Sequence, residues 1–505
     1  MINRPGRVPF AITSIACGAL LAILVGSCAQ PTAQPLASVI PASSTATPTP
    51  SASLPTASLV PEPTPTVAPT PVAKPSVIVE RVPKVAEFKV APGTEPSISA
   101  DPFTGTLAVV EEHIANNAAP CSRPAVRFSR DGRSWTAPSY PWGRVCQDVH
   151  AVIAWGPSPA NPMIERLWAA DAVGVSGGVS ISVTYSDNEG KTWAKPYIER
   201  RTRPWVGCYP AIGVDTSMGS PTFGAVFVAY NWLASSKGPG VSVIASVDGV
   251  HWAITQVPTV PQVKGYSNYN RIGYRISSVG GATWLSFYQA DLRTYVAPGK
   301  RAIIGEGSRS NAGRRIVALT KLDLSVTPKS ATNAVQTISL HSGMSEVTEM
   351  PVAAISSLGL DFWQTALAVD AAGLPWSVGS SGGKVLLAHM TSTTGGLTWD
   401  HWTFSVPGRS SSKPSVAVDN TGSVVFVGWH ASSGGRYLSY FVISYDSGTT
   451  WTAPTLASKA SWRDAGGYNG VGLRENATWA NGSFYWAVGD NRTGTPTVYV
   501  EMVTP

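Results

Sequence analysis

The sequence predicts an all-β protein and, within that class, a β-propeller. The chain of 505 residues is poor in charged side chains and contains 48 glycines and 18 tryptophans, which is typical of short strands joined by many turns. From residue 82 onward the sequence contains a repeat of about sixty residues. Each copy predicts an apolar strand, a Gly or Asn turn, a second apolar strand, a loop and a third strand. This period is typical of propeller blades rather than of solenoid repeats.

Residues 1–28 predict an export signal that ends in a lipobox. Arg4 and Arg7 precede an apolar stretch from Pro9 to Val25, which is too short and too early for a typical membrane span. The stretch runs into Leu-Val-Gly-Ser-Cys, and small residues before Cys28 resemble the processing site of bacterial lipoproteins. We expect Cys28 to carry lipid; the alternative is an ordinary signal peptide with a chance cysteine.

Residues 29–81 predict a disordered stalk, because Pro, Thr, Ser, Ala and Val dominate the segment and cannot form a packed core. No later apolar run is long enough to cross a bilayer, so residues 82–505 are expected outside the cytoplasm, on a cell surface or an outer membrane, held there by the lipid. The formal charge of +7 is spread along the chain, which gives no reason to expect nucleic-acid binding.

The recurring phrase predicts seven blades. The seventh copy stops after three strands, whereas the segment from Val85 to Val90 lies before the first copy. We therefore expect this N-terminal strand to complete the last blade, which closes the ring and removes an open sheet edge. Six blades is the alternative, because the stretch from Gln289 to Ala353 is irregular.

A second, shorter phrase, Ser-x-Asp-x-Gly-x-Thr-Trp, follows the third strand of most copies. Residues 444–451 match it fully, and residues 186–193 match with Asn188 in the Asp position. Looser copies end at Trp135, Trp252 and Trp399. The phrase resembles the Asp-box, or BNR repeat, of bacterial sialidase-like β-propellers, and the wider resemblance covers residues 85–505.

The resemblance implies that these boxes lie between the third and outermost strands, on the face opposite the functional mouth. Side chains of Asp and Ser can accept hydrogen bonds from nearby backbone N–H groups, and Gly can adopt the left-handed conformation that such a turn needs. Because turn chemistry accounts for each residue of the phrase, we expect the boxes to fasten the blades rather than to bind a ligand.

The mouth is predicted from topology alone. If the inner strands run away from the mouth, it is lined by the starts of inner strands and the ends of second strands, which also places Glu95, Lys413 and His430 there. The candidate ligand-binding residues chosen from these positions are Asp148, His150, Trp205, Tyr209, Arg271, Arg293, Trp363, Asp490 and Arg492. Tryptophan faces suit the stacking of sugars. The favoured function is binding of a glycan or a surface protein by a monomer.

The alternative is an exo-sialidase or a related glycoside hydrolase. The resemblance implies three arginines for the substrate carboxylate, a tyrosine nucleophile with a neighbouring Glu, and an Asp acid/base. Tyr468 lies at the start of the last inner strand, and Arg271, Arg293 and Arg492 could converge on a carboxylate. The Arg-Ile-Pro motif of the family enzymes is absent, and no Glu is clearly paired with Tyr468.

Cysteine and histidine positions complete the predictions. Cys121 and Cys146 both fall on the mouth side, and we expect a disulfide between them that leaves Cys208 free. The histidines form no ligand-spaced motif, so neither a metal site nor a cofactor is expected.

Overall fold

The computed structural model describes sixteen stretches of the chain: residues 81–114, 122–143, 150–158, 161–175, 178–199, 210–220, 222–232, 240–257, 272–279, 282–290, 315–327, 337–342, 348–350, 366–392, 398–463 and 475–505. The chain divides into two units, residues 1–81 and 82–505, and every described strand belongs to the second. A search of the described stretches found no helix long and apolar enough to span a membrane.

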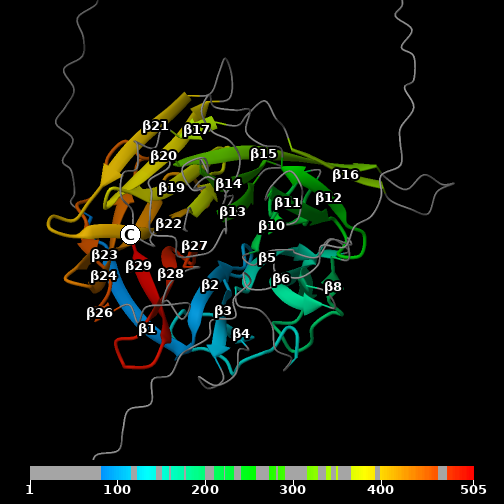
Figure 1. Ribbon diagram of the computed structural model, residues 1–505, viewed down its shortest axis with the longest axis horizontal. Coiled ribbons are helices and arrows are strands. Elements are labelled where there is room, and N and C mark those ends of the chain that lie inside the picture. The colour runs from blue at the N-terminus through cyan, green and yellow to red at the C-terminus, as the bar shows by residue number, and fades with distance from the viewer. Residues whose placement is uncertain are drawn as a thin grey trace, which may run out of the picture. The chain divides into compact units, whose positions relative to one another are not determined.

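The described strands pair into seven antiparallel sheets (Figure 1). The first sheet contains β2 (Thr94–Ala100), β3 (Leu107–Ile114) and β4 (Ser122–Ser129). The second contains β5 (Val152–Ser158), β6 (Asn161–Val175), β7 (Gly178–Ser186) and β8 (Tyr197–Ile198). The third contains β9 (Ala211–Val214), β10 (Val226–Trp232), β11 (Gly240–Ser246) and β12 (Ala253–Val257).

The remaining sheets follow in chain order. The fourth contains β13 (Ile272–Val279), β14 (Ala282–Ala290), β15 (Arg315–Thr327), β16 (Thr337–Ser342) and, beside β15, β17 (Thr348–Met350). The fifth contains β18 (Ala366–Val369), β19 (Pro375–Ser381), β20 (Lys384–Ser392) and β21 (Thr398–Phe404). The sixth contains β22 (Ser410–Val418), β23 (Val425–Ser433), β24 (Arg436–Ser444), β25 (Thr455–Leu456) and, beside β24, β26 (Trp462–Arg463). The closing sheet contains β27 (Ala477–Ala480), β28 (Ser483–Asp490), β29 (Thr497–Thr504) and β1 (Lys84–Pro92).

The sheets are arranged as a β-propeller. Their first strands contact one another in the order β2, β5, β9, β13, β18, β22 and β27, and β27 contacts β2 again. In Figure 1, β2, β5, β13 and β22 lie toward the centre, and β4, β8, β16 and β21 toward the rim. Six sheets have four or five strands, whereas the first has three and carries an isolated bridge between Val126 and Ser139 beyond β4.

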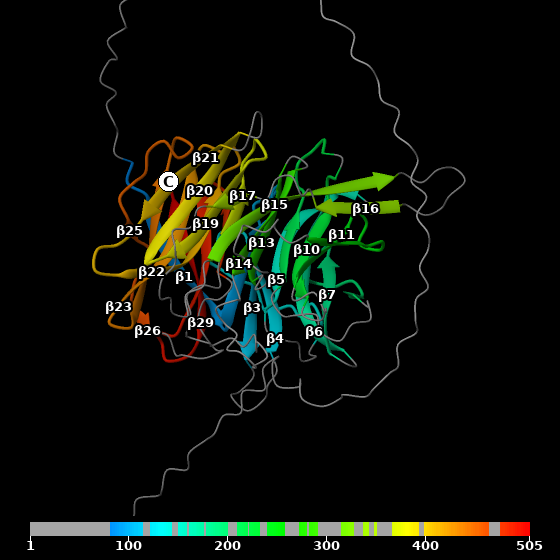
Figure 2. The same cartoon turned by 45° about the horizontal axis from the view of Figure 1, so that its top comes forward.

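The core lies between neighbouring sheets, so each sheet is apolar on both faces. In β10, Val226 and Val228 pack against the second sheet, while the alternate residues Phe227 and Ala229 face the fourth. Figure 2 shows this stacking, with β6 and β7 of the second sheet next to β10 and β11 of the third. Because side chains alternate along a strand, burial on both faces requires a continuous apolar run, as in Ala225 to Tyr230.

Ser-Asp-Gly-Trp turns form directly after the third strands β4, β7, β11 and β24, as the pattern predicts, whereas residues 393–397 of the copy that ends at Trp399 lie outside the described residues. After β24, Ser444 Oγ donates to Asp446 Oδ1 at 2.8 Å, and Gly448 N donates to Ser444 Oγ at 2.7 Å. Thr450 N donates to Asp446 Oδ1 at 2.8 Å, and Trp451 packs against the core shared with the fifth sheet. Equivalent bonds to a serine hydroxyl are made by the backbone N–H groups of Gly132, Gly190 and Gly249. Each turn therefore satisfies its own backbone and fastens one sheet to the sheet before it.

The ring closes through β1, as the sequence predicts. This strand pairs antiparallel with β29, from Lys84 opposite Thr504 to Pro92 opposite Thr497, with a register shift between Lys89 and Ala91. The first strand of the folded unit thereby covers an edge that the last strand would otherwise expose.

Replacement of Gly448 by alanine is expected to destabilise the fold by about 2–4 kcal/mol. Its φ is +91°, and an added Cβ would lie 2.9 Å from atoms of both Trp376 and Trp402 in the fifth sheet. The matched control is Gly219→Ala, because Gly219 has a φ of +86° with no atom within 4 Å of an added Cβ. That variant is expected to be destabilised by about 1 kcal/mol, because it adds only the strain of a positive φ and no steric clash. Denaturant unfolding measures both, and equal losses would show that the turn glycine does not interlock the sheets.

Candidate functional site

The two ends of the sixth sheet differ in chemistry. In the sixth sheet, Val425 of β23 pairs with Ser444 at the end that carries the turn, whereas Ser432 pairs with Ser410 at the other end. The second end holds the start of the inner strand β22 and the last residues of β23. We call it the mouth-side end.

Three of the predicted site residues are described, namely His150, Asp490 and Arg492. The other predicted residues lie outside the described stretches: Tyr468, Asp148, Trp205, Tyr209, Arg271, Arg293 and Trp363, together with Cys28, Cys121, Cys146 and Cys208.

His150 belongs to a buried cluster with Glu95 and Glu112, which we call the histidine cluster. The exposed fractions are 1% for Glu95, 0% for Glu112 and 1% for His150. The imidazole Nδ1 of His150 bonds to Glu95 Oε2, and the backbone N–H of His150 donates to Glu112 Oε1. Ala151 N donates to the same Glu112 oxygen at 3.1 Å. One nitrogen donor and two carboxylates therefore meet at the mouth-side end of the first sheet.

Local backbone irregularities place these side chains. The pairing register of β2 shifts between Thr94 and Ser97, and Glu95 inside this shift has a φ of +48°. His150 has a φ of +117° just before β5. Positive φ is unfavourable for residues with a Cβ and tends to occur at functional sites. The extra residue at the shift turns the Glu95 side chain out of the strand alternation and toward His150.

Topology predicted Glu95 and His150 at the mouth but missed Glu112. This residue lies within β3, in the run Leu-Ala-Val-Val-Glu-Glu-His-Ile, where the five positions before it are buried. The sequence feature that could have identified Glu112 is the pair of adjacent carboxylates in an otherwise apolar strand. Since strand residues alternate, Glu111 faces the other way and bonds to Arg127 Nε at 2.8 Å.

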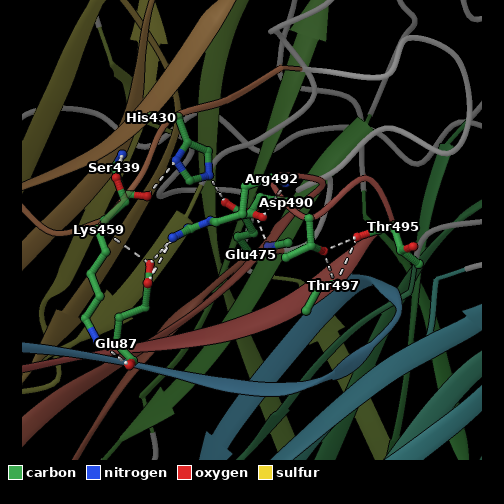
Figure 3. Close-up of polar contacts among 12 residues, drawn as sticks. Glu87, His430, Ser439, Lys459, Glu475, Asp490, Arg492, Thr495 and Thr497 are labelled. Atoms are coloured by element: carbon green, nitrogen blue, oxygen red, sulfur yellow. Dashed lines mark hydrogen bonds and ion pairs between the residues drawn. The ribbon is translucent and has the colours of Figure 1, made fainter.

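Asp490 and Arg492 lie in a second buried group, at the junction of the sixth and closing sheets (Figure 3). Arg492 Nη1 lies 2.8 Å from Glu87 Oε1, and Arg492 Nε donates to Asp490 Oδ2 at 2.5 Å. Lys459 Nζ donates to the backbone oxygen of Glu87 at 3.2 Å. Glu87 belongs to β1, the strand that closes the ring. We therefore call Glu87, Asp490 and Arg492 the closure cluster. It ties the N-terminal strand to the loop after β28.

Next to the closure cluster, Ser439, His430 and Glu475 have the order of a Ser-His-acid triad. The Ser439 hydroxyl lies 3.2 Å from His430 Nδ1, and His430 Nε2 contacts Glu475 Oε2 (Figure 3). All three residues are at most 1% exposed, and Glu475 Oε1 accepts a hydrogen bond from Gly489 N at 2.9 Å. A nucleophile must reach its substrate, so a serine sealed in the middle of β24 does not fit that role. The three residues link two sheets.

Glu501 of β29 is the acid at the centre of this junction. It is fully buried, and Glu87 is directly opposite it on β1. Burial raises its pKa well above the usual value, and the nearby carboxylates of Glu87 and Glu475 raise it further, whereas Ser439 and Arg492 act in the opposite direction. The folded protein therefore favours the neutral acid at this position.

No protein-family model and no curated protein matches the chain. Among solved structures, it is similar to an ulvan lyase of a polysaccharide lyase family, at 9% identity and a TM-score of 0.47 over 83% of this chain and 95% of that one. It is also similar to a Hadza microbial sialidase, at 12% identity and a TM-score of 0.39 over 81% of this chain and 65% of that one. A third is an α-L-arabinofuranosidase from Fusarium graminearum, at 12% identity and a TM-score of 0.41 over 71% and 97%. Likeness at this level says nothing about activity.

Replacement of Arg492 by leucine is expected to destabilise the protein by about 3–5 kcal/mol, because it leaves the buried carboxylates of Asp490 and Glu87 without their cation. The control is Arg130→Leu, since Arg130 and Glu189 form a salt bridge in which the side chains are 80% and 39% exposed. Loss of this surface pair is expected to cost at most about 1 kcal/mol. Denaturant unfolding at neutral pH compares the two, and similar small losses would argue against a role for the closure cluster in stability.

Glu501 predicts a pH dependence of stability. Its folded pKa is raised, so the folded state binds the proton more tightly than the unfolded state, and the free energy of unfolding falls as pH rises above the usual pKa of a glutamate, 4.5. The fall is at most about 1.4 kcal/mol per pH unit for one proton. In Glu501→Gln, the free energy of unfolding should fall less steeply as pH rises. The exposed Asp400→Asn serves as the control and should leave it unchanged. An unaltered profile in Glu501→Gln would mean that another group sets it.

Proposed function

We propose that this protein is a lipid-anchored, extracytoplasmic β-propeller that binds a glycan or a surface-protein ligand at its mouth-side end. The observation that carries the proposal is the histidine cluster, where ionisable side chains are buried and two non-glycine residues adopt positive φ. Packing alone favours apolar residues in relaxed conformations, so such costs concentrate at functional sites. The opposite end carries the turns whose side chains already satisfy their own backbone.

The anchor and the blade number belong to the same proposal. The apolar stretch before Cys28 and the Pro-rich segment after it support export, lipidation and a stalk. We count the three-stranded first sheet as a blade because its first strand, β2, contacts both β5 and β27. On this count we propose seven blades, with six as the alternative.

The binding function is tested on a glycan array with the full chain in detergent. Binding to at least one glycan class is expected, with Trp205→Ala and Trp363→Ala each lowering affinity about tenfold or more, as truncation of a stacking aromatic does. The control is Phe103→Ala, because Phe103 is 41% exposed and lies in the turn between β2 and β3, away from the mouth-side end. Equal losses in all three variants, or no binding to the array and no surface protein captured, would contradict the proposal.

The alternative, a glycoside hydrolase with Tyr468 as nucleophile, predicts a different result. Release of methylumbelliferone from a sialoside, abolished in Tyr468→Phe, would establish that activity. In the described stretches, Arg492 is paired with Asp490 and Glu87, which occupies the guanidinium that a substrate carboxylate would need. This pairing favours the binder.

A further inference from the structure

The histidine cluster has the composition of a metal site. One ligand atom each from Glu95, Glu112 and His150 can be chosen so that all lie within 4.8 Å of one another. The three residues come from different parts of the chain, the start of β2, the end of β3 and the residue two before β5. We propose that they bind a first-row divalent cation such as Zn²⁺. This inference goes beyond the proposed function and does not depend on it.

The donor set selects the class of metal. An imidazole nitrogen with two carboxylates suits Zn²⁺ and its first-row neighbours, whereas Ca²⁺ takes six to eight oxygen ligands. Three protein ligands leave one position of a tetrahedral zinc site for water or a ligand group. Two carboxylates also balance the charge of a divalent cation, so the occupied site would be neutral.

Burial supplies a second, independent observation. Glu95 is 1% exposed, and its Oε1 has no hydrogen-bond partner although its Oε2 contacts His150. A buried polar atom without a partner costs free energy, and a carboxylate oxygen costs more than a neutral one. A cation held between Glu95, Glu112 and His150 would bind this oxygen. The unsatisfied atom and the converging ligands thus have one common explanation.

A second histidine in the same protein shows what an ordinary buried pair looks like. His389 Nε2 lies 3.0 Å from Asp370 Oδ2, and the other oxygen of Asp370 accepts hydrogen bonds from Ala372 N and Leu374 N, both at 2.9 Å. Both carboxylate oxygens of Asp370 therefore have partners, one within its own turn and the other on β20. His389 also stacks on Trp376, with ring centroids 3.7 Å apart. The histidine cluster differs by its second carboxylate and its unpartnered oxygen.

The experiment measures metal directly. The full chain, purified in detergent without an affinity tag or chelator, is analysed by inductively coupled plasma mass spectrometry. It is then stripped with a chelator and titrated with Zn²⁺ by calorimetry. About one equivalent of metal per chain is expected, with Glu95→Gln and His150→Asn each weakening Zn²⁺ binding about tenfold or more, as loss of a ligand should. His389→Asn is the matched control and should bind Zn²⁺ as the wild type does.

The wild-type titration decides the matter even where a variant fails to fold. Absence of saturable Zn²⁺ binding to the stripped, folded wild-type protein would overturn the proposal. So would Zn²⁺ binding that is equally strong in folded Glu95→Gln and His150→Asn proteins, because the metal would then lie elsewhere. Circular dichroism establishes that each variant is folded. Since no glycan is involved, failure here is distinguishable from failure of the proposed binding function.

Discussion

The propeller depends on the antiparallel pairing of β1 with β29, which joins the beginning of the folded unit to its end. The described part of the other six sheets is built from strands that follow one another along the chain, so no other sheet needs such a distant partner. Without β1, the backbone groups on one edge of β29 would be unpaired and available to other chains. The buried ion pairs from Glu87 to Arg492 reinforce the junction, although a buried salt bridge adds specificity of pairing as much as free energy.

Local chemistry explains how much of this fold the sequence could predict. Apolar runs, turn residues and the phrase around Ser444 act over a few residues, so strands, turns and the closing strand followed from the pattern. The histidine cluster did not follow, because its three members come together only when two sheets pack. Glu112 lies in an apolar strand, and its neighbours in the sequence do not indicate which residues its carboxylate contacts. The expectation of no metal site rested on ligand spacing, which considers residues close together on one segment and not residues brought together from three.

The two ends of the sheets divide stability and function between them. At the turn end, Asp446 accepts its hydrogen bonds from residues within four positions of itself, so those side chains are fully used by the fold. At the mouth-side end, Glu95 keeps a buried carboxylate oxygen without a hydrogen-bond partner. Natural sequences violate local rules mainly where a function repays the cost. This contrast directs attention to the end without a repeated motif.

Closure by the first strand has a consequence for how the chain folds. Glu87 and Arg492 are 405 positions apart, and β1 leaves the ribosome long before β29 exists. Each hairpin in between can form as it emerges, but the final pairing must wait for the whole chain and bear the entropy of closing the largest loop in the molecule. Until β29 forms, the pairing edge of β1 is exposed, and a chain that ends before β29 would leave it exposed. Only a chain that contains both β1 and β29 can pair these two edges with each other.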